Sequence, residues 1–125
     1  MEENQFERTA LLLGKASVEK LAEKRVAVFG VGGVGGFVCE GLVRAGIGAI
    51  DIVDKDIVAI SNINRQLIAL HSTVGKNKVD VLEERLKDIN KNLIIKKYKC
   101  FFLPETSETF DFREYDYVVD AIDTV

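Results

Sequence analysis

The sequence is poor in several residue types, and each shortage excludes a class of protein. A single proline among 125 residues excludes a proline-rich disordered chain. The two cysteines, Cys39 and Cys100, are too few for a disulfide framework or a zinc knuckle. No apolar run approaches the roughly 20 residues that span a bilayer, and the opening MEENQFERT lacks the basic and apolar segments of a secretory signal. These shortages predict a reduced, cytoplasmic protein without a membrane partner.

Acidic and basic residues are nearly balanced. The 17 Lys and Arg residues against 20 Asp and Glu residues give a formal net charge of −3. This balance argues against a chain that binds nucleic acid chiefly through a basic surface. A composition of 47% hydrophobic and 30% charged residues is ordinary for a globular chain, and the length corresponds to one domain or part of one.

Short apolar runs alternate with helical patterns along the chain. Helical pieces are expected at 6–13 and 17–22, strands at 25–29, 49–53, 92–98 and 117–122, and longer helices at 34–45 and 73–90. This order predicts an α/β fold with a doubly wound, Rossmann-like, mostly parallel sheet of strand order 3-2-1-4. The third strand is less apolar than the others, so it belongs nearer a sheet edge.

The fourth expected strand ends close to the last residue. Parallel strands normally have both faces covered, and no helix follows this strand to cover it. We therefore expect residues 1–125 to be the N-terminal portion of a longer α/β protein whose C-terminal half is absent.

The run Gly30-Val31-Gly32-Gly33-Val34-Gly35-Gly36 joins the first strand to the helix that follows it. Gly30 lets the chain turn sharply, Gly32 lets a phosphate approach the backbone amides, and Gly35 lets helix and strand pack closely. The helix then presents free N–H groups and its positive dipole end to an anion. The motif predicts a phosphate-binding loop, and its alternative is a tight structural turn.

Charged side chains follow the expected strands at 49–53 and 117–122. Asp54 lies 19 residues after Gly35, where a carboxylate accepts hydrogen bonds from ribose hydroxyls. Arg65 and Lys78 together could neutralise a triphosphate, which a dinucleotide's pyrophosphate requires less. Asp123 could hold Mg²⁺ between phosphate oxygens. The alternative is that the two cations are surface charges and that Asp123 caps a helix.

These residues belong to five ordered blocks that resemble a known family. The blocks are GVGGVGG (30–36), VDKD (53–56), SNINRQ (61–66), VGKNKV (74–79) and DAID (120–123). From Arg8 to the last residue, the chain resembles the ThiF/MoeB/HesA family, the bacterial relatives of ubiquitin-activating (E1) enzymes. The resemblance implies that residues 1–125 are the nucleotide-binding N-terminal portion of an adenylation domain.

The resemblance also implies an activity and a set of site residues. Members adenylate a substrate carboxylate with ATP and Mg²⁺, release pyrophosphate, and usually act as homodimers. The implied nucleotide site comprises Gly30, Gly32, Gly33 and Gly35 in the loop, Asp54 at the ribose, Asp56 and Asn62 lining the site, and Arg65, Gln66 and Lys78 at the phosphates, with Asp123 at the metal. Arg8 matches a family arginine that reaches the ATP of the partner subunit, so Arg8, Arg65, Lys78 and Asp123 are the implied catalytic residues.

Three segments favour one branch of the family. Arg8-Thr9 with the leucines after it, ALHSTVGK at 69–76 and DAIDTV at 120–125 resemble the tRNA threonylcarbamoyladenosine dehydratases. Those enzymes use ATP to activate the threonyl carboxylate of a modified adenosine in tRNA, so that it closes into a cyclic form. The resemblance implies the same reaction here, with tRNA as the substrate.

Three other functions stay open at this point. One is adenylation of the C-terminal carboxylate of a ubiquitin-like sulfur-carrier protein, although Thr124 stands where those activators commonly carry Asn. Another is an NAD-dependent oxidoreductase, which would leave Arg65 and Lys78 without a task. The third is a non-catalytic nucleotide-binding fragment.

Some reactive or basic residues are expected to have structural roles. Cys39 lies among apolar helix positions and is expected in the core. His71 is expected in a loop or at a helix cap. The lysines at 96, 97 and 99 could contact RNA, but a solvated strand edge accounts for them better.

Overall fold

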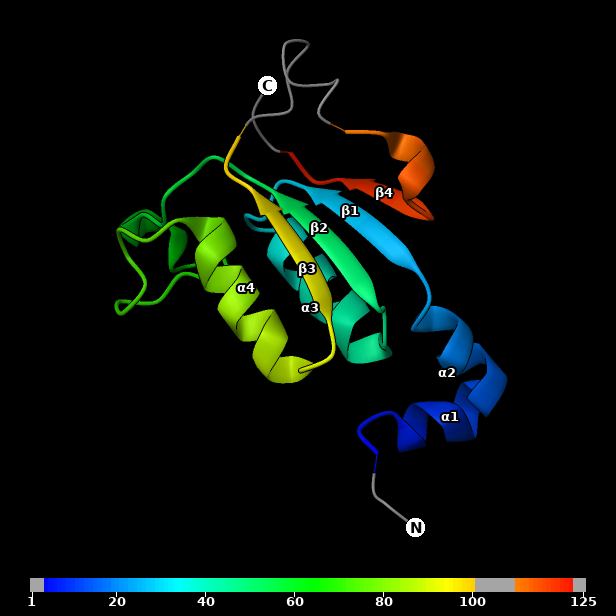
Figure 1. The fold of residues 1–125 in the computed structure, drawn as a ribbon. Coiled ribbons are helices and arrows are strands. Elements are labelled where there is room, and N and C mark those ends of the chain that lie inside the picture. The colour runs from blue at the N-terminus through cyan, green and yellow to red at the C-terminus, as the bar shows by residue number, and fades with distance from the viewer. Residues whose placement is uncertain (1–3, 101–109, 123–125) are drawn as a thin grey trace.

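Four parallel strands form one sheet in the computed structural model, which describes residues 4–100 and 110–122 (Figure 1). The strands are β1 (Arg25–Phe29), β2 (Ala49–Val53), β3 (Ile94–Tyr98) and β4 (Tyr117–Asp120). Their spatial order is β3-β2-β1-β4, and every pairing is parallel. The predicted α/β class and strand order are thereby confirmed, as is the place of β3 at a sheet edge.

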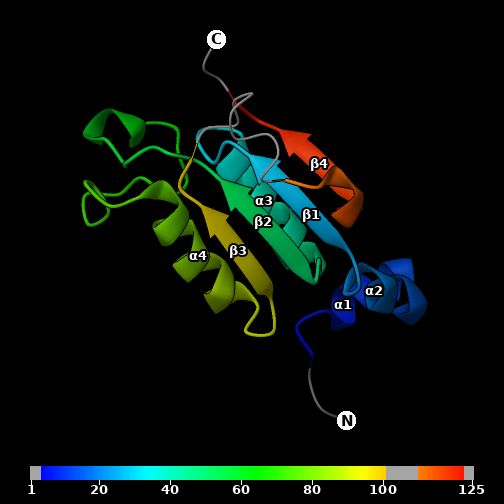
Figure 2. The ribbon, with the colours of Figure 1, turned by 45° about the horizontal axis from the view of Figure 1, so that its top comes forward.

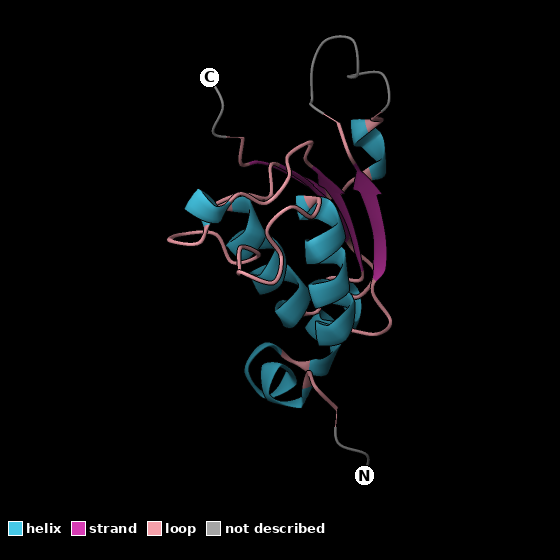
Figure 3. Cartoon of the chain, turned by 90° about the vertical axis from the view of Figure 1, so that its left-hand side faces the viewer, coloured by secondary structure: helices cyan, strands magenta, loops and turns pink. Residues whose placement is uncertain are grey.

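One face of the sheet is covered by two helices. These are α3 (Gly35–Ala45) and α4 (Lys78–Ile89), which lie together on the same side of the strands in the view of Figure 3. Alternate strand residues point toward them, and Val28, Ile52 and Leu82 are fully buried in the core between sheet and helices. The inner strands β1 and β2 are buried on both faces, because apolar side chains there meet packing partners on either side.

The opposite face is covered, in the described residues, by the segment that precedes β4. This segment includes the short 3₁₀ helix η3 (Phe112–Glu114) and lies across the sheet from α3 and α4 (Figure 3). The Phe110 ring packs edge-on against Phe29 and Tyr98, with centroids 5.1 and 5.0 Å apart. A second, smaller core therefore forms on this face.

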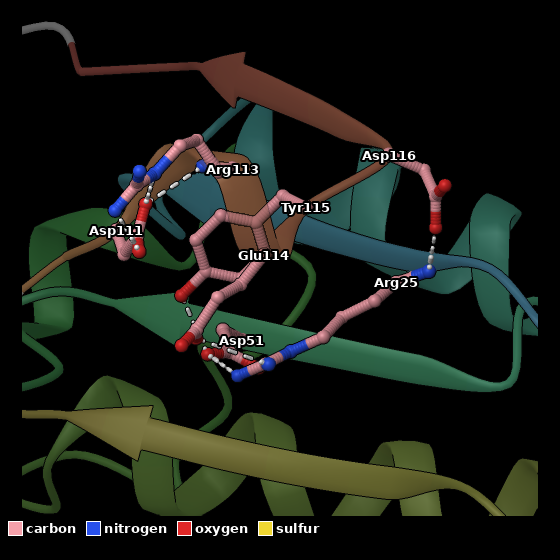
Figure 4. A network of polar contacts seen from close by, with 7 residues as sticks. All are labelled: Arg25, Asp51, Asp111, Arg113, Glu114, Tyr115 and Asp116. Carbon is pink, nitrogen blue, oxygen red and sulfur yellow. Dashed lines mark hydrogen bonds and ion pairs between the residues drawn. The ribbon is translucent and has the colours of Figure 1, made fainter.

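An ionic network fixes the same segment to the sheet (Figure 4). Asp51 of β2 is buried, and its carboxylate accepts hydrogen bonds from Arg25 Nη2 and from the Tyr115 hydroxyl, both at 2.7 Å. The Arg25 guanidinium lies over the Tyr115 ring and is 3.4 Å from Glu114, while the Arg25 backbone N–H donates to Asp116 at 2.8 Å. The hydrogen bond that Arg25 donates to Asp51 raises the pKa of Arg25, and burial next to this carboxylate raises the pKa of Tyr115. Both side chains that donate to Asp51 therefore keep their protons.

The two N-terminal helices lie beyond the amino ends of the strands (Figure 1). They are α1 (Glu7–Leu13) and α2 (Lys15–Leu21), separated at Gly14, where φ is +91°. The two helical pieces expected at 6–13 and 17–22 are thus confirmed, but the second begins at Lys15 rather than 17. Gly48, at the start of β2, lets this end pack closely, because a Cβ there would lie 1.8 Å from the carbonyl oxygen of Ala22.

Other predicted element boundaries are wrong by two to five residues. The helix expected at 73–90 begins only at Lys78, because Gly75 has a φ of +90° and residues 75–77 run antiparallel to residues 57–58. The third strand begins at Ile94 rather than 92, after a turn in which the Leu93 N–H donates to the Asn90 carbonyl. The fourth strand ends at Asp120 rather than 122. Among the described residues, no helix is long and apolar enough to cross a membrane.

Candidate nucleotide-binding site

The glycine loop leaves the carboxyl end of β1 and leads into α3. Gly30 has a φ of +91°, and a Cβ there would lie 2.7 Å from the carbonyl oxygen of Ala121, so this turn requires glycine. A Cβ on Gly35 would lie 1.7 Å from the Gly30 carbonyl oxygen, which explains how the first turn of α3 packs onto the loop. Gly33 has open space around its Cβ position, whereas the Gly32 position faces the Gln66 side chain.

Asp54 connects the glycine loop to the segment after β2. One carboxylate oxygen accepts a hydrogen bond from the Val31 N–H at 2.9 Å, and the other accepts from the Asp56 N–H at 2.8 Å. The carboxylate therefore holds the backbone of the loop while its remaining lone pairs stay available to a ligand. Its predicted contact with a ribose stays a prediction.

The polar segment that follows Asp54 folds back toward the glycine loop. The loops at the carboxyl ends of the strands come forward in Figure 2. Asn62, in the 3₁₀ helix η1 (Ile60–Asn62), is buried and accepts a hydrogen bond from the Ala59 N–H at 2.8 Å. Arg65 is exposed, and its Nη1 donates to the Ser61 carbonyl and the Asn64 side chain at 3.2 and 2.9 Å. Asn62 thus organises the segment, and Arg65 extends from it into solvent.

Gln66 places a polar side chain directly against the glycine loop. The residue is 6% exposed, and its Nε2 would lie 3.3 Å from a Cβ on Gly32. Its Oε1 is buried and has no hydrogen-bond partner in the described part of the chain. A buried acceptor left unpaired costs about 1–3 kcal/mol, so this atom is suited to receive a donor from a bound molecule.

Lys78 begins α4 with its side chain buried. Its backbone N–H donates to the Asp56 carbonyl at 3.1 Å, and its Nζ lies 3.8 Å from the Asp56 carboxylate. Lysine is rarely buried without a functional or pairing reason. Lys78 is therefore linked through Asp56 and Asp54 to the glycine loop. The predicted roles of these residues and of Gln66 in nucleotide binding stay predictions.

Arg8 lies apart from this arrangement, and Asp123 cannot be placed relative to it. Arg8 is exposed on α1, beyond the opposite end of the strands from the glycine loop (Figure 1). Asp123, the predicted metal ligand, lies outside the described residues. Within the described ranges, no three His, Cys, Asp or Glu side chains form a group that could hold a metal ion.

The residues expected to be structural are placed as predicted. Cys39 is fully buried on α3, and burial raises the pKa of its thiol to about 12, which leaves it unreactive. His71 is exposed in a turn. Lys97 and Lys99 form ion pairs with Asp80 of α4 at 2.8 and 2.9 Å.

A hollow lies between α3, α4 and Gln5, away from the glycine loop. It has a volume of about 460 Å³ and is lined by Gln5, Arg44, Arg85, Asp88 and Ile89. Glu40 pairs with both arginines and Asp88 also lines the hollow, so two carboxylates balance the two guanidinium groups there. The glycine-loop end of the sheet remains the better candidate for an anionic ligand.

A glycine loop at a helix N-terminus and an acidic residue after β2 are features of the Rossmann-like class of nucleotide-binding folds. The family model of the ThiF family matches residues 6–125. The chain therefore belongs to the ThiF family.

Within this family, the chain is similar to tRNA threonylcarbamoyladenosine dehydratases. The chain is 50% identical over 122 residues to the tRNA threonylcarbamoyladenosine dehydratase of Bacillus subtilis, covering 98% of this chain and 48% of that protein. It is 41% identical over 123 residues to the dehydratase of Haemophilus influenzae, covering 98% of this chain and 47% of that protein. The crystal structure of the Escherichia coli dehydratase in complex with ATP matches with a TM-score of 0.93 and 39% identity, over 97% of this chain and 50% of that chain. The chain spans about half the length of these relatives.

Proposed function

We propose that this chain is the nucleotide-binding portion of an ATP-dependent adenylating enzyme, a tRNA threonylcarbamoyladenosine dehydratase. The observation that carries the proposal is the buried Lys78 beside a glycine loop, in a fold that matches an ATP-bound dehydratase with a TM-score of 0.93. A buried cation next to free helix N–H groups suits a triphosphate. An NAD-dependent oxidoreductase would give this cation no partner of comparable charge.

The proposed reaction converts a poor electrophile into a good one. The threonyl carboxylate oxygen attacks the α-phosphorus of ATP, the bond to the β-phosphate oxygen breaks, and pyrophosphate leaves. Ring closure onto the activated carbonyl then expels AMP, so that one water is lost from the nucleoside overall. The protein's task in the first step is to align the carboxylate with the phosphorus and to neutralise the phosphates.

Each site residue has a role in this proposal. The glycine-loop N–H groups, Arg65 and Lys78 bind phosphate oxygens, and Asp54 accepts hydrogen bonds from the ribose. Gln66 supplies an amide with an unpaired acceptor at the base of the site. Asp123 would hold Mg²⁺, which when bound neutralises phosphate charge and polarises the α-phosphate.

The proposal includes a cytoplasmic homodimer. Arg8 lies too far along the molecule, beyond the amino ends of the strands, to join the site of its own chain (Figure 1). In a symmetric dimer the same residue would reach the ATP of the partner. The exposed leucines Leu11 and Leu12 on α1, each 84% exposed, support burial of this helix against a second copy. Sedimentation of the intact protein measures the oligomeric state.

The test uses the intact protein with ATP, Mg²⁺ and tRNA that carries threonylcarbamoyladenosine. We expect mass spectrometry to show loss of one water from the modified nucleoside, with release of AMP and pyrophosphate. Lys78→Gln should lower the rate about 100-fold or more, as the loss of a charge-stabilising donor does. Lys91→Gln, which removes an exposed lysine beyond α4, should leave the rate unchanged.

Replacing one reactant at a time distinguishes the dehydratase from an oxidoreductase and from an activator of a sulfur-carrier protein. NAD in place of ATP should neither bind tightly nor support turnover, and tighter binding of NAD than of ATP would contradict the proposal. A ubiquitin-like sulfur-carrier protein in place of tRNA should not stimulate pyrophosphate exchange. Stimulation by the carrier and not by tRNA would assign the adenylation site to the other acceptor.

A further inference from the structure

The ion pair between Lys78 and Asp56 is strongly asymmetric in its exposure. The Lys78 side chain is 7% exposed, whereas the Asp56 side chain is 55% exposed. The two charged groups are 3.8 Å apart, which is longer than a direct hydrogen bond. The amine is therefore confined by packing, while the carboxylate borders solvent and is free to turn away.

The backbone on both sides of this pair is fixed. The Asp56 N–H donates to Asp54 at 2.8 Å, and the Asp56 carbonyl accepts from the Lys78 N–H at 3.1 Å. The Val58 N–H donates to the Lys76 carbonyl at 2.8 Å, so the segment after Asp56 lies beside the segment before Lys78. Movement of the Asp56 carboxylate away from Lys78 therefore requires only side-chain rotation and no change in the loop.

A buried ammonium group needs a nearby negative charge. Removing the partner of a buried charge is costly, because the remaining charge is left without solvent or counter-ion. In the described part of the chain, the Lys78 amine forms an ion pair with Asp56 alone. A triphosphate that approaches the glycine loop brings a larger negative charge to the same amine.

We propose that Asp56 is a positioning residue, the resident counter-ion of Lys78 that a polyphosphate displaces on binding. The proposal rests on the proposed function only for the identity of the polyphosphate, ATP. It assigns Asp56 a role opposite to that of a nucleotide ligand. The carboxylate keeps the lysine in place in the empty site and competes with the phosphates for it.

The two roles differ in the sign of a mutational effect. If Asp56 competes with phosphates, Asp56→Asn strengthens binding of ATP and of inorganic tripolyphosphate, by about three- to tenfold for a charge at this distance near the surface. Asp56→Glu, whose longer side chain reaches the amine more closely, weakens both. Adenosine, which has no phosphate, binds all three proteins equally. Calorimetry on the intact protein measures the three ligands.

A double-mutant cycle shows that the effect passes through Lys78. In a Lys78→Gln background, Asp56→Asn should no longer change the affinity for tripolyphosphate. Glu84→Gln removes an exposed negative charge from the same helix as Lys78 and should change none of the affinities. Because the comparison of tripolyphosphate with adenosine is made within one protein, a partial loss of folded protein does not alter its sign.

Several outcomes overturn the proposal. Equal weakening of ATP and adenosine by Asp56→Asn makes Asp56 a direct nucleotide ligand. An unchanged tripolyphosphate affinity makes the ion pair inert, and an effect that persists without Lys78 makes it general repulsion. Tripolyphosphate binding keeps this test separate from the proposed function, since the predicted signs can hold in a protein that does not convert tRNA.

Discussion

One methyl group at position 35 decides whether the glycine loop can form. A Cβ added at Gly35 would overlap the Gly30 carbonyl oxygen. That oxygen belongs to the backbone, so no flexible side chain can move aside to relieve the overlap. Gly41 on the same helix has open space around its Cβ position and is exposed. Position 35 therefore requires glycine, whereas position 41 of the same helix can accept a side chain.

Gly35→Ala should destabilise the protein by about 2–4 kcal/mol, because the backbone must shift to relieve the overlap. Gly41→Ala should instead stabilise it by about 0.5–1 kcal/mol, since alanine loses less conformational freedom in a helix. Urea unfolding of both variants measures the difference. Equal stabilities would show that the loop accommodates a side chain at position 35.

The same residues show how far a sequence predicts a site. The spacing of Gly30, Gly35 and Asp54 is sufficient to predict a loop and its acidic neighbour, because backbone geometry depends on residue type at each position. The orphaned amide oxygen of Gln66 is different, since it depends on how a loop of some twenty residues folds back. Nor does sequence spacing indicate that Asp54 would bond to the loop backbone at Val31.

At the scale of elements, α4 and the edge strand β3 are joined by charge. Lys97 of β3 contacts Asp80 and Glu83 of α4 at 2.8 and 3.0 Å, and Lys99 also pairs with Asp80. The hydrogen bonds from Lys97 and Lys99 lower the pKa of Asp80 to about 2. These lysines thus hold the edge strand to its helix, in agreement with the expected structural role.

Asp80→Asn should lower stability at neutral pH, and the deficit should shrink in acid. A carboxylate whose pKa is about 2 in the folded protein, against 3.8 as its ordinary value, contributes stability above the ordinary value and loses it as the pH falls toward 2. Urea midpoints of both proteins between pH 7 and pH 3 measure this convergence. A deficit that stays constant with pH would exclude the ion pairs as its source.

Element types were easier to predict than element ends. The runs 25–29 and 49–53 matched β1 and β2 residue for residue, because apolar and β-branched side chains predominate in both. The start of α4 was missed because Val74 continues the helical pattern in the sequence. Its position is decided instead by the antiparallel contact between Ile57 and Asn77, which no local pattern indicates.

At the scale of the whole molecule, the buried Asp51 joins segments that are far apart in the sequence. Arg25 lies 26 residues before it and Tyr115 lies 64 residues after it. An aspartate between two isoleucines in a buried strand was a signal in the sequence, but its partners were not, since they come from β1 and from the segment before β4. The network keeps that segment against the face of the sheet opposite to α3 and α4 (Figure 4).

Asp51→Ala should cost about 3 kcal/mol or more, because Arg25 and Tyr115 lose their shared acceptor in a buried position. Tyr115→Phe removes only one of these hydrogen bonds and should cost about 1 kcal/mol. Guanidinium unfolding monitored by tyrosine fluorescence for Asp51→Ala, and by circular dichroism for both, measures the two values. A cost for Asp51→Ala no larger than that of Tyr115→Phe would mean that the network contributes little.

Because β1 pairs with β4, the sheet cannot be completed early in the synthesis of the chain. The hydrogen bond from Arg25 to Asp116 closes a separation of 91 residues, so β1 lacks its second neighbour until the residues of β4 have left the ribosome. At ordinary translation speeds this interval is roughly 5–20 s. During it, the central strand exposes a row of unpaired amides and carbonyls. Nascent chains are thus prone to aggregate through β1 before β4 emerges, and chaperone binding to this part of the chain should be highest in that interval.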